Sequence, residues 1–85
     1  MAKVLLPRQL AVELFGGREH FDLPATTLFG LIHALEALGP GFEARAGHTV
    51  AIAVDGVMVD DWSTPVRADS EVLVVMRVAG GAGRS

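Results

Sequence analysis

The sequence predicts one small α+β domain, in which a mixed sheet packs on one main helix. Three observations carry this prediction. A leucine-rich stripe at helical spacing ends at Leu38, an Asp-Gly pair joins two β-rich runs, and the last apolar run has the composition of a strand. A chain of 85 residues with one long helix and several short strands fits a two-layer architecture.

The N-terminal part reads as a strand, a helical turn and a returning strand. The apolar run Lys3–Leu6 predicts a short strand, and Arg8–Phe15 has apolar residues spaced like a helical turn. Gly16-Gly17 permits a tight reversal because glycine tolerates positive φ. Arg18–Leu23 alternates and predicts the returning strand, which Pro24 ends.

The main helix is the clearest element of the pattern. Thr26 or Thr27 can cap its start, and Gly39 is placed for a left-handed C-cap before Pro40. Gly30 inside the helix suggests close packing on the sheet. The residues expected on its buried stripe are Leu28, Leu31, Ile32, Leu35 and Leu38.

The C-terminal half predicts a hairpin and a final strand. Gly39–Thr49 is expected to be loop, and Asp55-Gly56 between Val50–Val54 and Val57–Val59 is a strong hairpin signal. Asp60–Asp69 reads as a second loop, in which Trp62 partly covers the core. The strand Glu71–Val78 follows, so we expect a domain over residues 1–79 and a flexible glycine-rich tail over 80–85.

Composition excludes several classes of function. The charged fraction of 20% is too low for a chain that is disordered throughout, and the net charge of −3 argues against nucleic-acid binding. The absence of cysteine excludes a disulfide scaffold and thiol chemistry. The longest apolar runs are far too short to span a membrane, and the N-terminus does not read as a signal peptide, so the cytoplasm is the expected location.

Polar residues offer little chemistry of their own. The three histidines, His20, His33 and His48, lack metal-ligand spacing and are expected on solvated faces. Asp60-Asp61 beside Trp62 reads as a turn rather than an acid–base pair. We therefore expect no catalytic residue and no metal site, and a small enzyme is disfavoured.

The order of elements together with the glycine tail resembles the ubiquitin-like β-grasp fold, and more narrowly the MoaD/ThiS sulfur-carrier family. The resemblance covers residues 2–81. The segments that carry it are Val54-Asp55-Gly56, Thr64-Pro65-Val66, Ala68-Asp69-Ser70-Glu71-Val72 and Val78-Ala79-Gly80-Gly81. The extra turn over Arg8–Phe15 makes the chain look more like the molybdopterin-synthase small subunit than the shorter thiamine carrier.

The resemblance implies covalent chemistry at the glycine tail. Family members are adenylated at the C-terminal glycine carboxylate by a ubiquitin-activating-type enzyme, which uses ATP, and are then converted to a thiocarboxylate that donates sulfur. Gly81 would be the acyl terminus and Gly80 its slim neighbour. An active carrier ends at the second glycine, so a protease, of the JAMM metalloprotease type in related systems, would remove Ala82–Ser85.

The period of two in the last strand predicts a partner surface. If Val72, Val74 and Met76 face the helix, then Leu73 and Val75 lie exposed beside the tail. We expect these two residues to bind the activating enzyme and the sulfur acceptor, such as a synthase large subunit. The partner-binding set continues towards the tail with Arg77, Val78 and Ala79.

The sequence leaves other functions open. The product could be molybdopterin, thiamine, cysteine or another sulfur-bearing compound. A β-grasp interaction module with an inert tail and a ubiquitin-like modifier joined to lysines through Gly81 are the alternatives. The protein itself requires no cofactor in any of these readings.

Overall fold

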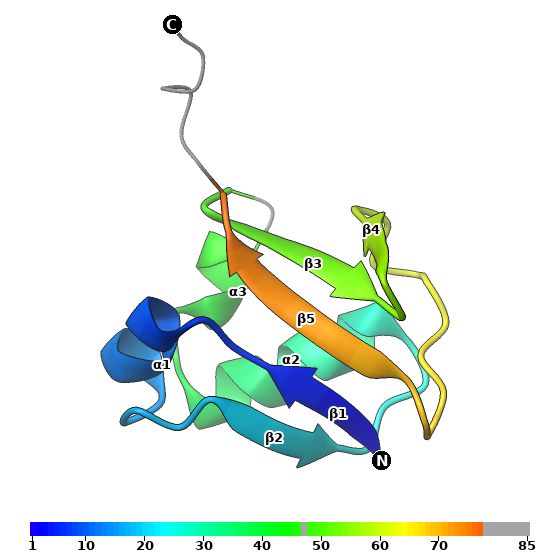
Figure 1. Cartoon of the computed structure of the whole chain (residues 1–85), viewed down its shortest axis with the longest axis horizontal. Coiled ribbons are helices and arrows are strands. Elements are labelled where there is room, and N and C mark those ends of the chain that lie inside the picture. Colours follow the sequence, from blue (N-terminus) through cyan, green and yellow to red (C-terminus); the bar gives the residue numbers. More distant parts are fainter. Residues whose placement is uncertain (47, 78–85) are drawn as a thin grey trace, which may run out of the picture.

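A five-stranded sheet forms one layer of the protein, and helices pack against it (Figure 1). The computed structural model describes residues 1–46 and 48–77. In chain order the elements are β1 (Ala2–Leu5), α1 (Arg8–Leu14), β2 (His20–Leu23), α2 (Leu28–Leu38), α3 (Phe42–Arg45), β3 (Val50–Val54), β4 (Val57–Val59) and β5 (Glu71–Met76). The predicted α+β architecture with a mixed sheet is confirmed.

The sheet is built from two hairpin-like units joined by the last strand. The strand order is β2-β1-β5-β3-β4, with β1 and β5 parallel and all other neighbours antiparallel. The strands β1 and β2 pair with each other, as do β3 and β4, and β5 lies between the two pairs. The central position of β5 beneath the helices explains the apolar residues of its inner face, because Val72 and Val74 are buried there.

Both predicted reversals adopt the left-handed backbone that their residues permit. Gly16 and Gly17 have φ of 64° and 91°, and Asp55 and Gly56 have φ of 52° and 85°, as a type I′ turn requires. The Asp55 turn is also fixed to the start of β5. Its carboxylate accepts hydrogen bonds from the Glu71 N–H at 2.9 Å and the hydroxyl of buried Ser70 at 3.1 Å.

The start of α2 is fully capped. The Thr27 hydroxyl accepts a hydrogen bond from the Gly30 N–H at 3.2 Å, so the predicted threonine cap is confirmed at the second of the two candidates. The N–H groups of Leu28 and Phe29 donate to the carbonyls of Thr64 and Trp62. The loop that carries Trp62 therefore completes the helix, and Trp62 packs partly buried against the core as predicted.

Three predictions about this helix are wrong. Leu38 is 50% exposed, while the other four stripe residues are buried. Gly39 has φ −140° and is not a left-handed cap; it is needed because a Cβ there would lie 2.6 Å from the Phe15 ring. Gly30 is exposed, and a Cβ there would meet only the Thr27 hydroxyl at 3.6 Å, so it does not mark packing on the sheet.

The segment predicted as loop over Gly39–Thr49 contains a short helix. Gly41, with φ 107°, lets the chain turn into α3, which buries Phe42 against the core. The Glu36 carboxylate holds this turn by accepting hydrogen bonds from the N–H groups of Glu43 and Gly41. Burial of the Phe42 side chain therefore stabilises a short helix in a segment that is rich in glycine and charged residues.

The core lies between the inner face of the sheet and the helices. Its aromatic part is a cluster in which the Phe15 ring meets Phe21 and Phe42 edge to face, with centroids 5.2 and 6.0 Å apart. Within the described ranges, every helix is too short or too polar to cross a membrane.

Candidate functional site

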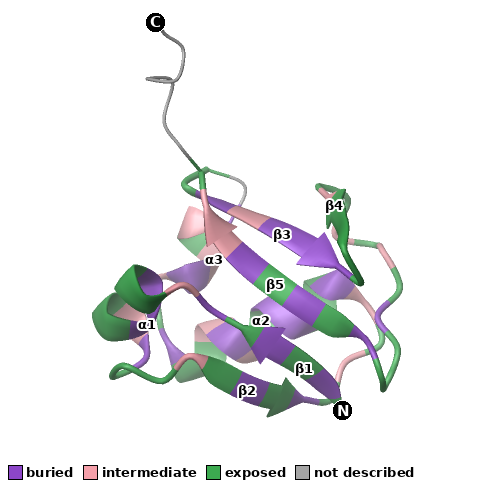
Figure 2. Cartoon of the chain, in the orientation of Figure 1, coloured by how far each residue is buried: buried purple, intermediate pink, exposed green. Residues whose placement is uncertain are grey.

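The outer face of the sheet is left uncovered by the helices. Strands in the centre alternate buried and exposed residues, as Figure 2 shows for β1 and β5. Val72 and Val74 point inward and are at most 2% exposed, whereas Leu73 is 42% exposed on the opposite side. The predicted orientation of this strand is confirmed at these three positions.

The register aligns one row of mostly apolar side chains across all five strands on this outer face. Leu73 pairs with Leu5 on one side and with Ala53 on the other, and the row continues outward from each of these. Its members, from β2 to β4, are His20, Leu5, Leu73, Ala53 and Met58. Leu5 is 40% exposed and Met58 59%, so the row forms an apolar band in contact with solvent.

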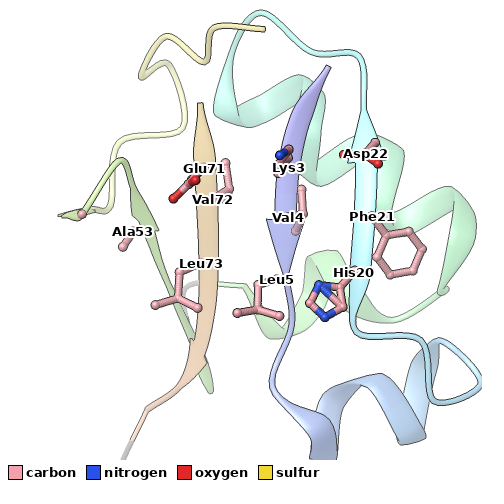
Figure 3. A pocket seen from close by; sticks show the side chains of 11 residues that line it. Lys3, Val4, Leu5, His20, Phe21, Asp22, Ala53, Glu71, Val72 and Leu73 are labelled. Atoms are coloured by element: carbon pink, nitrogen blue, oxygen red, sulfur yellow. The ribbon is translucent and has the colours of Figure 1, made fainter. Parts of the chain in front are cut away.

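A shallow hollow of about 540 Å³ lies over this band (Figure 3). Leu5 and Leu73 project into it from neighbouring strands, with His20 beside Leu5. The adjacent row of the sheet consists of charged residues. In the strand register, Lys3 lies opposite Asp22 on one side and opposite Glu71 on the other. The hollow can therefore accept an apolar side chain of a partner, with ionic groups on the side where β5 begins.

The other end of β5 leads to the glycine tail. Val75 is half-buried beside Ala51, so the prediction that it is exposed like Leu73 holds only in part. Met76, predicted to point inward, is also half-buried. Arg77 is exposed; its N–H donates to the Thr49 carbonyl at 2.7 Å and its Nε to the Val50 carbonyl at 3.4 Å. These bonds tie Arg77 to the backbone at the start of β3.

Four predicted site residues lie outside the described residues. They are Val78, Ala79, Gly80 and Gly81, together with the expected tail over residues 80–85. Of the predicted partner-binding set, the structure thus places Leu73 and Val75 on β5 and Arg77 directly after its end.

The predictions that the histidines are exposed and that Asp60-Asp61 belongs to a turn are confirmed. His20, His33 and His48 are exposed, and within residues 1–46 and 48–77 no group of three His, Asp or Glu residues could hold a metal ion. The Asp61 carboxylate accepts hydrogen bonds from the Ser63 hydroxyl and N–H at 2.7 and 2.9 Å. These bonds lower the pKa of Asp61 and make the Asp60-Asp61 segment a turn.

Sequence reasoning missed Leu5, Ala53 and Met58 as members of the outer face. Alternation within a strand shows that two faces exist, but the register between strands decides which side chains become neighbours. For Leu5 one signal was available, because it alternates with Val4 and Leu6 in a run where only every second residue can face the helices.

Comparisons with known proteins identify the family. The model of the ThiS family matches residues 4–81, which is nearly the whole chain. No match is found among curated proteins.

Solved structures share the fold at low sequence identity. The CysO of Mycobacterium tuberculosis, described as an antigen, has a TM-score of 0.80 and 22% identity over 92% of this chain and 100% of its own. A chain of the BexX/CysO complex of Amycolatopsis orientalis has a TM-score of 0.81 and 20% identity, covering 95% and 100%. A chain of the complex of subunits 1 and 2 of the molybdopterin-converting factor of Helicobacter pylori has a TM-score of 0.64 and 23% identity, covering 94% and 97%.

These likenesses confirm the β-grasp fold that the sequence predicts, and the family match extends from the first strand through both tail glycines. The chain belongs to the ThiS family of ubiquitin-fold sulfur carriers.

Proposed function

We propose that the protein carries sulfur as a thiocarboxylate on Gly81, after removal of Ala82–Ser85. A ubiquitin-activating-type enzyme consumes ATP to adenylate the Gly81 carboxylate, and a sulfur donor then displaces AMP. The thiocarboxylate gives its sulfur to a precursor in molybdopterin or related biosynthesis in the cytoplasm. The protein is a carrier with no cofactor or catalytic residue of its own.

The observation that carries this proposal is the continuity between the apolar outer face and the tail. The band around Leu73 lies on the same strand that ends at Met76, and Arg77 is tied to β3 directly after it. A partner that covers Leu5 and Leu73 therefore contacts the strand that leads in sequence to Gly80 and Gly81. That geometry suits an enzyme whose active site must receive a narrow glycine end.

The sheet face accounts for two kinds of partner. Two of the structural relatives are described as complexes with a second protein, BexX in one and a molybdopterin-converting factor subunit in the other. For this chain we propose an activating enzyme and a sulfur acceptor that use the Leu73 face in turn. A processing protease is the third proposed partner, because the glycine pair is followed by four residues.

Intact-mass measurement tests the proposal. The chain ending at Gly81 is incubated with the activating enzyme, ATP and a sulfur source, and we expect the mass to rise by the difference between sulfur and oxygen. The matched control is the same chain with Gly81→Ala, which should gain no sulfur. A chain that stays unmodified while the enzyme adenylates another member of the family would contradict the carrier function.

A further inference from the structure

The strand β4 forms one edge of the sheet and, apart from its short length of three residues, carries none of the features that usually protect an edge strand. It pairs only with β3, and within the described residues no backbone hydrogen bond reaches it from another element (Figure 1). One row of its backbone N–H and C=O groups is therefore free to pair. Charged residues, proline and bulges usually block such an edge, but β4 reads Val57-Met58-Val59.

The side chains of β4 make this edge apolar on both faces. Met58 is 59% exposed at the end of the outer apolar row, and Val57 on the opposite face is 64% exposed. Val59 is half-buried near Trp62. The other edge strand, β2, differs because its exposed positions are His20 and Asp22.

Carboxylates flank β4 at both ends. Exposed Asp55 precedes it in the turn, and exposed Asp60 and Asp61 follow it. Within the described residues none of the three forms an ion pair. Antiparallel pairing of two copies around Met58 would place Asp55 of one chain opposite Asp61 of the other at both ends. Repulsion between these like charges opposes a dimer through this edge.

We propose that β4 is a docking edge for an extended segment of a partner protein whose apolar centre is flanked by lysine or arginine residues. Such a segment would add a sixth strand to the sheet through backbone hydrogen bonds. Its apolar side chains would cover Val57 and Met58, and its cationic ends would face Asp55 and the Asp60-Asp61 pair. None of Val57–Val59 lines the Leu73 hollow, although Met58 ends the same outer apolar row, and strand addition requires no thiocarboxylate chemistry.

The test uses two synthetic peptides that differ only in flanking charge, Lys-Lys-Val-Thr-Val-Lys-Lys and Glu-Glu-Val-Thr-Val-Glu-Glu. Amide resonances of the full chain are followed by NMR as each peptide is added. We expect the lysine peptide to shift the amides of Val57–Val59 and to protect that of Met58, whose N–H points away from β3. It should bind about tenfold more tightly at low salt than the glutamate peptide. A lysine peptide methylated on its backbone nitrogens should lose binding.

Matched variants connect the effect to this edge. Met58→Lys should abolish binding of the lysine peptide, whereas Val12→Lys, at an equally exposed apolar position on α1, should leave it unchanged. Asp60→Asn should reduce the preference for lysine over glutamate by about threefold. Equal binding of both peptides, or shifts confined to other strands, would overturn the proposal.

A second copy of this chain could occupy the β4 edge instead of a partner protein. Sedimentation of the full chain at low salt should give a monomer, because repulsion between Asp55 and Asp61 of two copies is then unscreened. A dimer that Met58→Lys disrupts would assign the edge to a second copy and contradict the proposed partner.

Discussion

Two glycines in or next to α2 have opposite structural roles. Gly39 is buried at the end of the helix, where a Cβ would lie 2.6 Å from a Phe15 ring carbon and 2.7 Å from the Leu14 carbonyl oxygen. Gly30 is exposed in the first turn, where a Cβ would have only ordinary contact with Thr27. Space, rather than backbone conformation, therefore explains the first glycine.

Gly39→Ala should destabilise the protein by about 1–3 kcal/mol, because the methyl group would displace Phe15 or the backbone of α1. Gly30→Ala is the matched control and should raise the free energy of unfolding by roughly 0.5–1 kcal/mol. Urea denaturation of both variants measures the difference. An unchanged midpoint for Gly39→Ala would show that α1 can move aside without cost.

Glu36 is the one acidic residue of α2, and its carboxylate stabilises the turn that follows the helix. The N–H groups of Glu43 and Gly41 donate to its carboxylate at 2.9 and 3.2 Å. These bonds lower the pKa of Glu36 below its ordinary value of 4.5. The carboxylate therefore binds protons less readily in the folded chain than in the unfolded chain.

Glu36→Gln should lower stability at neutral pH, because an amide oxygen accepts these bonds less strongly than a carboxylate does. The contribution of the carboxylate is fully present above pH 4.5 and is lost as the pH falls through its lower folded pKa. Unfolding midpoints of the two proteins should therefore differ at pH 7 and converge in acid. A constant difference across this range would mean that the charge contributes nothing.

At the scale of elements, local signals fixed some parts of the fold and long-range contacts fixed others. The hairpin could be predicted because Asp55-Gly56 favours one turn type. The start of α2 could be predicted because the Thr27 hydroxyl can accept a hydrogen bond from the first turn of the helix. The helix α3 could not, because it depends on burial of Phe42 among distant residues. The exposure of Leu73 could be predicted from alternation. Its pairing with Leu5 and Ala53 depends on the register between strands.

The outer face of β5 gives a prediction that separates binding from stability. Leu73→Glu should reduce affinity for the activating enzyme at least about tenfold, since it places a charge in the centre of the apolar band. The free energy of unfolding should fall by no more than about 1 kcal/mol, because Leu73 is already 42% exposed.

The inward neighbour and a distant surface residue are the controls for this variant. Val74→Ala should cost about 2 kcal/mol of stability and leave affinity for the enzyme nearly unchanged, because Val74 is 1% exposed on the opposite face. Val12→Glu on α1 should affect neither quantity. Titration calorimetry measures the affinity for the enzyme, and urea denaturation measures the free energy of unfolding. A large loss of stability for Leu73→Glu would place this residue in the core.

At the scale of the whole molecule, the two hairpins depend on a single strand. Neither β1 nor β2 pairs with β3 or β4, so β5 makes all the strand-to-strand hydrogen bonds between them. A chain ending at Arg77 should keep its free energy of unfolding within about 0.5 kcal/mol while accepting no sulfur.

A chain ending at Ser70 is the complementary truncation and should not fold, because it lacks β5 entirely. Circular dichroism and the dispersion of amide resonances distinguish the two truncated chains. A folded sheet in the shorter one would mean that the helices alone hold the hairpins together.

The central position of the last described strand has a consequence for synthesis on the ribosome. A nascent chain can form the β1–β2 and β3–β4 pairs early, but these remain unconnected until β5 leaves the exit tunnel and inserts between them. Leu5 and Leu73 become neighbours only at that moment. The surface that a partner would recognise therefore forms only on chains translated through β5, and interrupted translation products lack it.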